Sequence, residues 1–512
     1  MGSDSEEENG MRLSGIVPLL RGVPKRVLEH RLEFLAFFFA FGIRLIPEIL
    51  SWPDPLGFDT VTWLAPFMQI CQEDGLGEGI SLIATRQGAP FAFLLFGFVA
   101  SLTGAHPLLL TKITAPFLFG FLVWSFFYFS KKLLGWSEKK VLLASVVLSL
   151  YFIPLRLSWD LYRNLLGLAF LLIALSHSSS LDLKRDRAIF AVFSLLAIFT
   201  HELVAVLVLL LYCYLFFLRY WKHRKPSPML LVCALVATLF VLFYAHWLFP
   251  PTGATILSSR PIEPIEFPVD YLSARGPYSY ANLGEIYGDV LALALLSFLP
   301  LFPLCVKGFF RNKLLDGWCV ILSVGSFSVL SYPTMAIPLW NRWMFMLIFP
   351  VVIYGTNSLF HLDKKKIALY LSALIVLSSA FIALPSERAF PYFSMSHTVR
   401  YVPSSMLQNT VPLSDSDDVR SVLRWLDQNA EENSTLLAHY AFVGWAELYT
   451  RKVEIVSYFT IDEVEQTDLE SSSTVYTIWW ERGTGWYQEQ TPSLEFSEVH
   501  KSGRIAIYER SM

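Results

Sequence analysis

Five ionisable side chains stand at three separate turns of the chain, where they could meet on one side of a membrane. Asp54 and Asp59 follow the first apolar segment, Asp160 separates two later ones, and His201 and Glu202 interrupt a long apolar run. Convergent carboxylates can act as a general base, orient an acceptor hydroxyl, or hold Mg²⁺ or Mn²⁺ through oxygen ligands. Each Asp taken alone is equally compatible with a solvated loop residue, so the prediction depends on the three turns sharing one side.

Two arginines lie in or beside apolar segments, where a charge is costly. Near the bilayer centre a charge costs about 2.5–3.5 kcal/mol, so such residues usually face the interior of a helical bundle. Arg342 begins one apolar segment and Arg44 lies near the outer end of the first. A guanidinium can bind a phosphate through two parallel hydrogen bonds, so we predict that both contribute to a phosphate site. Snorkelling of either side chain to the interface is the alternative.

The composition indicates a polytopic membrane protein. Of 512 residues, 54% are hydrophobic and 16% are charged, and the mean hydropathy is +0.48. Soluble proteins carry roughly 25% charged residues. The net charge of −3 is too balanced to suggest a nucleic-acid partner. Four of the five cysteines lie in or beside apolar segments, so neither a disulfide framework nor a zinc site is expected.

Apolar runs long enough to span a bilayer predict about eleven transmembrane helices. A span needs about 20 mostly apolar residues. Nine candidates are clear, and the run 188–218 is interpreted as a hairpin of two further spans with its turn at His201. The shorter run 89–104 is predicted to be a re-entrant or interfacial helix. The nine clear candidates are 34–50, 108–130, 141–157, 163–179, 229–249, 289–307, 317–338, 342–360 and 367–385.

Basic loops set the orientation of these spans. Short loops rich in Lys and Arg stay in the cytoplasm, and placing all six basic segments on one side puts the N-terminus inside and the C-terminus outside. The predicted organisation is a cytoplasmic tail with a disordered start (1–32), a transmembrane domain (33–385) and an extracytoplasmic α/β domain (386–512). Long outer loops are expected at 51–107 and 250–288.

The C-terminal domain alternates helical and strand patterns. Val419–Asn429 reads as an amphipathic helix, because its apolar residues recur on one face. Strands are expected at Ser434–His439, Val453–Tyr458 and Val475–Trp480, and a hairpin is expected from Glu495–Val499 to Arg504–Glu509. Trp479-Trp480-Glu481-Arg482-Gly483 is similar to an acceptor motif of oligosaccharyltransferases, but the preferred interpretation is a strand end.

The layout resembles the GT-C superfamily of integral membrane glycosyltransferases, which take sugars from polyprenyl-phosphate-linked donors. The motifs that carry the resemblance are Gly42-Ile43-Arg44-Leu45, Gly57-Phe58-Asp59-Thr60, Gln87-Gly88-Ala89-Pro90, Leu102-Thr103-Gly104, Trp159-Asp160, Arg163-Asn164, Thr200-His201-Glu202 and Asn341-Arg342-Trp343. An extracytoplasmic C-terminal domain follows them, as in this superfamily.

The resemblance implies a role for each candidate residue. Asp59 would be the catalytic carboxylate, with Asp54 as a substitute, and Asp160 would occupy the second acidic position. His201 and Glu202 would support the acceptor or a metal, and Arg342 would hold the donor phosphate. The second turn offers one acidic residue where the metal-dependent oligosaccharyltransferases have a pair, so the metal requirement, Mg²⁺ or Mn²⁺, stays open.

The predicted function is therefore transfer of a sugar, with inversion, from a polyprenyl phosphate to a lipid, glycan or protein acceptor outside the plasma membrane. An oligosaccharyltransferase or glycan ligase is the nearest alternative. A transporter or lipid flippase is the alternative from another class, and it predicts ionisable groups at the bilayer midplane rather than at outer span ends. Membrane lipids are the remaining expected partners.

Overall fold

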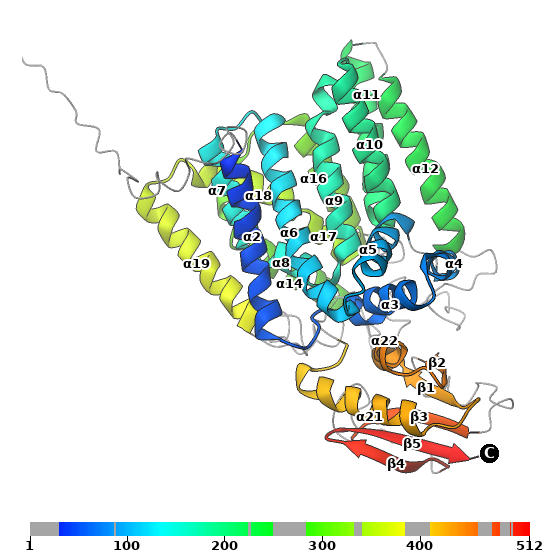
Figure 1. The fold of residues 1–512 in the computed structure, drawn as a ribbon. Coiled ribbons are helices and arrows are strands. Elements are labelled where there is room, and N and C mark those ends of the chain that lie inside the picture. The colour runs from blue at the N-terminus through cyan, green and yellow to red at the C-terminus, as the bar shows by residue number, and fades with distance from the viewer. Residues whose placement is uncertain are drawn as a thin grey trace, which may run out of the picture.

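A body of roughly aligned helices carries a smaller α/β domain against one end (Figure 1). The computed structural model describes residues 30–86, 89–223, 227–248, 283–331, 340–383, 410–458, 474–481, 492 and 495–511. Residues 1–29 of the predicted tail, most of the predicted loop 250–288, and residues 386–409 lie outside this described part of the chain.

The helical body is built from elements in chain order, including the π-helix η2 and the short 3-10 turn η3. Its first part comprises α2 (Arg31–Leu50), η2 (Thr60–Leu64), α3 (Ala65–Glu73), α4 (Leu76–Arg86), α5 (Pro90–Thr103), α6 (Pro107–Lys132), α7 (Glu138–Ser149), α8 (Phe152–Asp160) and α9 (Tyr162–Ser176). Its second part comprises η3 (Ser178–Ser180), α10 (Lys184–Thr200), α11 (Glu202–His223), α12 (Pro228–Leu248), α14 (Leu283–Phe298), α15 (Phe302–Gly308), α16 (Lys313–Ser331), α17 (Trp340–Met346), α18 (Ile348–Leu359) and α19 (Lys364–Ala383).

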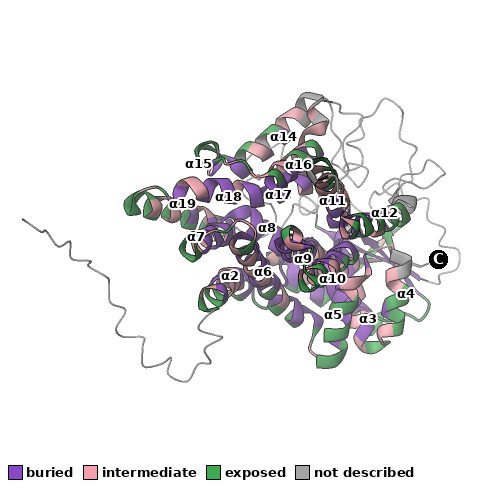
Figure 2. Cartoon of the chain, turned by 90° about the horizontal axis from the view of Figure 1, so that it is seen from above, coloured by how far each residue is buried: buried purple, intermediate pink, exposed green. Residues whose placement is uncertain are grey.

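Helix α9 lies at the centre of this body. Every residue of α9 except Arg163 is buried, and α9 packs against α6 and α10 while α6 also packs against α2. Seen from above, buried residues concentrate around α8 and α9, whereas outer helices such as α5 and α19 expose many residues (Figure 2). A helix that is apolar all round is suited to such an interior position.

The prediction of about eleven membrane spans is wrong. Among the described residues, three helices are long and apolar enough to cross a bilayer: Pro107–Lys132, Glu202–Trp221 and Lys364–Ile382. A fourth exists if α7 and α8, bent by 60° at a short break, are taken as one span. The hydropathy of the sequence overcounted because it registers a continuous apolar run and not where the helix breaks.

The breaks are visible in the predicted spans themselves. The run 141–157 is divided between α7 and α8, 289–307 between α14 and α15, and 342–360 between α17 and α18. By contrast, the predicted break at His201 is present, because His201 has an extended backbone between α10 and α11. The run 89–104 forms only the 14-residue α5, which begins at Pro90 and ends before the left-handed Gly104.

The C-terminal domain has the predicted α/β pattern. Its helices and strands are η7 (Leu413–Asp415), α21 (Ser416–Asn429), β1 (Thr435–His439), α22 (Tyr440–Tyr449), β2 (Glu454–Tyr458), β3 (Thr474–Trp480), β4 (Ser497–Ser502) and β5 (Ile505–Ser511). The sheet order is β2-β1-β3-β5-β4, in which β1 pairs in parallel with β2 and β3, and β5 pairs antiparallel with β3 and β4. The prediction that the Trp479-Trp480 run ends a strand is confirmed.

The domain core follows from the alternation of buried and exposed positions. All positions of the central strands β1 and β3 are buried, as expected for strands covered on both faces. The predicted apolar face of α21 is completely buried through Val419, Val422 and Leu423. The helix therefore contributes its apolar face to the core and leaves its polar face outward.

The C-terminal domain docks directly on η2. Val61, Ala65 and Leu108 of the helical body belong to the same buried apolar cluster as the core of the domain. At Gly444 of α22 the two backbones come so close that a Cβ would overlap the Val61 carbonyl oxygen and lie 2.7 Å from the Thr62 Cα. This contact requires glycine because backbone atoms cannot move aside as a flexible side chain can.

We expect Gly444→Ala to destabilise this docking. Overpacking against a rigid backbone costs about 1–3 kcal/mol, so the midpoint of thermal unfolding should fall. The matched control is Gly77→Ala in α4, where a Cβ meets no other atom within 4 Å. Equal unfolding midpoints for the two variants would contradict the contact between α22 and η2.

Candidate functional site

The first two acidic turns are fastened together by a hydrogen bond between buried hydroxyls. Thr60 Oγ1 and the Tyr162 hydroxyl lie 2.8 Å apart across 102 positions of sequence, and Thr60 also donates to the Leu56 carbonyl at 2.6 Å. Asp59 directly precedes Thr60, is partly exposed, and stands at the start of the π-helix η2. Short π-helical turns are frequent at functional sites. The contact therefore brings the segment of Asp59 to the segment that follows Asp160.

The third turn joins the same region through a carboxylate. Glu202 Oε1 lies 3.0 Å from Arg163 Nη1 and accepts a 2.6 Å hydrogen bond from the Ala89 backbone N–H. The Arg163 guanidinium lies over the Phe93 ring at 5.0 Å. The starts of α5, α9 and α11 are thus connected around one ion pair.

His201 and Arg342 extend this cluster. The His201 imidazole is buried, and its Nδ1 accepts the Leu203 backbone N–H at 3.0 Å, which caps α11. Burial lowers the pKa of His201, the Arg163 and Arg342 charges lower it further, and Glu202 opposes them. His201 is therefore neutral at physiological pH. The Arg342 Nε is buried and has no hydrogen-bond partner within the described part of the chain.

Arg44 lies in a buried ion cluster that the sequence analysis did not identify. Its Nη2 pairs with Glu48 Oε1 at 2.7 Å, and Lys112 Nζ from α6 pairs with Glu48 Oε2 at 3.3 Å. Arg44 Nε also donates to the Ser158 carbonyl at 3.3 Å, near the end of α8. These contacts favour a positioning role for Arg44, because it holds the turn that carries Asp160. The i, i+4 spacing of Arg44 and Glu48 was the available sequence signal.

Asp54 is held by the C-terminal domain. Arg420 Nη1 of α21 lies 2.6 Å from Asp54 Oδ1, with both side chains mostly buried, and Arg420 also pairs with Asp417. A second tether lies beyond η2, where Glu73 of α3 pairs with Arg451. Of the two candidate catalytic carboxylates, this pairing favours Asp59 over Asp54.

The remaining predicted residues and the metal question stay open. Asp160 is the last residue of α8, and its side chain lies outside the described part of the structure. Within the residues described, no group of three or more His, Cys, Asp or Glu side chains is arranged to hold a metal ion. The prediction of Mg²⁺ or Mn²⁺ therefore remains a prediction.

A double-mutant cycle should show strong coupling between Asp54 and Arg420. Because the pair is largely desolvated, we expect a coupling free energy of roughly 1–3 kcal/mol from denaturant unfolding of Asp54→Asn, Arg420→Ala and the double variant. The matched cycle uses Asp417→Asn, whose side chain is 90% exposed and should couple much less to Arg420. Additive effects of Asp54→Asn and Arg420→Ala would show that the pair does not hold the loop.

Comparisons with known proteins leave the family of this chain unassigned: no protein-family model matches the sequence, and no curated protein matches it significantly.

Proposed function

We propose that the chain is a membrane glycosyltransferase that moves a sugar from a polyprenyl-phosphate-linked donor to an acceptor outside the membrane. The observation that carries the proposal is the meeting of three distant turns, held by the Thr60–Tyr162 hydrogen bond and the Arg163–Glu202 ion pair. Such an arrangement supplies an acidic loop and guanidinium groups beside apolar helices, which suits a donor with an anionic head and an isoprenoid tail.

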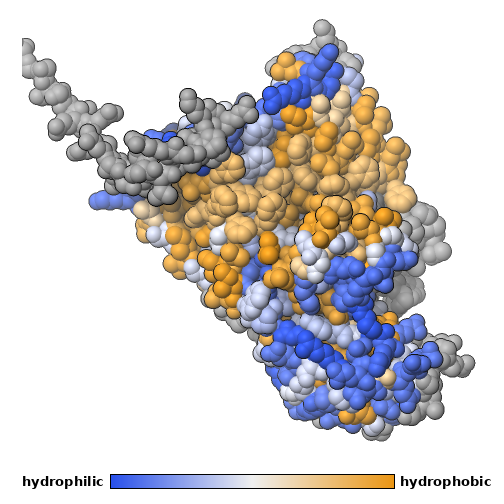
Figure 3. Space-filling view, in the orientation of Figure 1, coloured by the Kyte–Doolittle hydropathy of each residue, from blue (hydrophilic) through white to orange (hydrophobic). Residues whose placement is uncertain are grey.

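Exposed apolar side chains support location in a membrane. Apolar residues cover much of the visible face of the helical body, whereas the C-terminal domain is largely hydrophilic (Figure 3). Contiguous apolar surface of this kind is costly in water and marks contact with lipid or protein. The exposed residues include Leu94 and Leu102 of α5, Leu239 of α12, and Leu369 and Val376 of α19. We propose a multi-pass protein, with the N-terminus in the cytoplasm and the C-terminal domain outside the plasma membrane.

In the proposed reaction Asp59 acts as the base. Its carboxylate accepts the proton of an acceptor hydroxyl while that oxygen attacks the anomeric carbon of the sugar, and the polyprenyl phosphate leaves with the bonding electrons. Attack from the side opposite the phosphate inverts the anomeric centre. Arg342 binds the departing phosphate, Asp160 assists in acceptor orientation or in holding a divalent cation, and Glu202 with Arg163 keeps the turns in place.

Asp59→Asn should abolish most turnover and leave folding intact. A positioned general base contributes roughly 10²–10⁴-fold, so turnover should fall by about that factor while donor binding persists. The matched control is Asp74→Asn, because Asp74 is an exposed carboxylate farther along the same loop. An active Asp59→Asn variant would exclude this role, and loss of turnover in a well-folded Asp54→Asn variant would transfer it to Asp54.

Arg342→Ala should weaken donor binding more than it slows the chemical step. Removal of one partner from a desolvated charge pair costs roughly 2–5 kcal/mol, so the donor Kd should rise more than tenfold. Arg342→Lys should restore part of the affinity, since lysine keeps the charge but lacks the planar fork. Unchanged donor binding in Arg342→Ala would instead favour snorkelling of this side chain.

The donor class can be tested directly with purified protein in lipid-containing detergent. We expect label to move to an acceptor from at least one radiolabelled polyprenyl-phosphate sugar and not from a nucleotide sugar. The sequence lacks a Gly-rich strand-to-helix loop of the kind that binds a nucleotide diphosphate. Turnover with a nucleotide sugar alone, without polyprenyl lipid, would overturn the donor assignment. Transbilayer movement of the donor without transfer would indicate the flippase alternative.

A further inference from the structure

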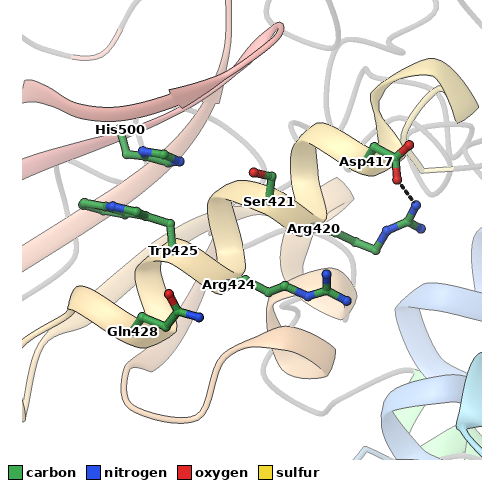
Figure 4. A pocket seen from close by; sticks show the side chains of 7 residues that line it. All are labelled: Asp417, Arg420, Ser421, Arg424, Trp425, Gln428 and His500. Carbon is green, nitrogen blue, oxygen red and sulfur yellow. Dashed lines mark hydrogen bonds and ion pairs between the residues drawn. The ribbon is translucent and has the colours of Figure 1, made fainter.

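A shallow groove of about 330 Å³ runs along the polar face of α21 in the C-terminal domain. Its wall is formed by one helix face and by one side chain from β4, as the close view shows (Figure 4). The side chains used below are Arg420, Ser421, Arg424, Trp425, Gln428 and His500. A pocket of this size falls at the lower end of the range found for small-ligand sites.

The two guanidinium groups of the groove are in different electrostatic states. Arg420 is buried and is neutralised by Asp54 and Asp417. Arg424 is exposed, lies over the Tyr449 ring at 5.4 Å, and pairs with no carboxylate in the part of the chain that the structure describes. Arg424 is therefore the cation available to a ligand, and a guanidinium prefers a carboxylate or phosphate.

Flat rings and neutral polar groups lie beside this cation. Trp425 and His500 are stacked, with ring centroids 4.6 Å apart and planes inclined by 6°. Ser421 and Gln428 lie one helical turn apart from Arg424 or Trp425 on the same face and offer a hydroxyl and an amide. Stacked rings fix the wall of the groove, while the hydroxyl and amide can exchange hydrogen bonds with hydroxyl-rich ligands.

The groove is connected to the loop that carries Asp59. Arg420 lines the groove and reaches Asp54 at 2.6 Å, five positions before Asp59 in sequence. Gly444 of the same domain contacts η2, which begins directly after Asp59. A ligand held along α21 is thereby held by the domain that is fastened on both sides of the proposed base.

We propose that this groove binds the acidic portion of a carbohydrate acceptor. Arg424 would pair with a sugar carboxylate or phosphate, and Trp425, Gln428 and Ser421 would contact the adjoining sugar ring. The word acceptor rests on the proposed glycosyltransferase function, whereas the binding of an acidic carbohydrate can be measured independently of any turnover.

The test is calorimetric titration of the full-length protein in detergent with four probes. These are a glucuronate-containing tetrasaccharide, a phosphorylated disaccharide, a neutral tetrasaccharide and inorganic phosphate. We expect one or both acidic sugars to bind at least about tenfold more tightly than the neutral sugar and inorganic phosphate, with affinity falling as salt rises. Arg424→Ala should weaken that binding by about tenfold or more, because a hydrogen bond to a charged group is lost.

Matched variants separate the groove from the rest of the domain. Trp425→Ala should also weaken the acidic sugar, whereas Arg510→Ala, which removes a cation paired with Glu495 outside the groove, should leave binding unchanged. Failure of both acidic sugars to bind, or equal affinity for wild type and Arg424→Ala, would overturn the inference. Sugar transfer with an unaltered acceptor KM in Arg424→Ala would overturn it while the proposed function stands. Binding without transfer would retain the groove and count against the function.

Discussion

The arrangement of the candidate site depends on charges that are buried inside an apolar helical body. Arg44, Glu48 and Lys112 are all nearly inaccessible, and removal of such charges from water is costly unless they pair with one another and form further hydrogen bonds. Glu48 satisfies both cations, Ser51 accepts from Lys112 at 3.1 Å, and the Ser158 carbonyl accepts from Arg44. Because these groups come from α2, α6 and α8, their pairing aligns the helix that leads to Asp59 with the helix that ends at Asp160.

The C-terminal domain constrains the same region from the other side. It pairs with Asp54 before η2 and with Glu73 after it, and α22 meets η2 backbone to backbone. A loop held at both ends loses much of its conformational freedom, which reduces the entropy that must be lost when catalytic groups are positioned. The domain is therefore part of the candidate site and not only an appendage of the helical body.

The arginines of the chain illustrate how one residue type serves different ends. Arg44 and Arg420 face carboxylates of the same chain, which occupies their guanidinium groups in holding elements together. Arg342 keeps a buried Nε without a hydrogen-bond partner among the described residues, and Arg424 lacks a carboxylate partner there. A guanidinium that is not neutralised within the chain is the better candidate for an anionic ligand, which is why the two proposals rest on Arg342 and Arg424.

Local patterns in the sequence determined the C-terminal helix and strands, the break at His201 and the short helix after Pro90, because alternation, helical periodicity and Pro or Gly signals act over a few residues. The sequence also identified the three turns that carry Asp59, Asp160 and Glu202. Only the tertiary structure decided the span count, since helix breaks inside apolar runs leave no hydropathy signal. It also decided which partners the charges take: the pairing of Asp54 with Arg420 joins residues 366 positions apart, and such a choice depends on packing across the whole molecule rather than on neighbouring residues.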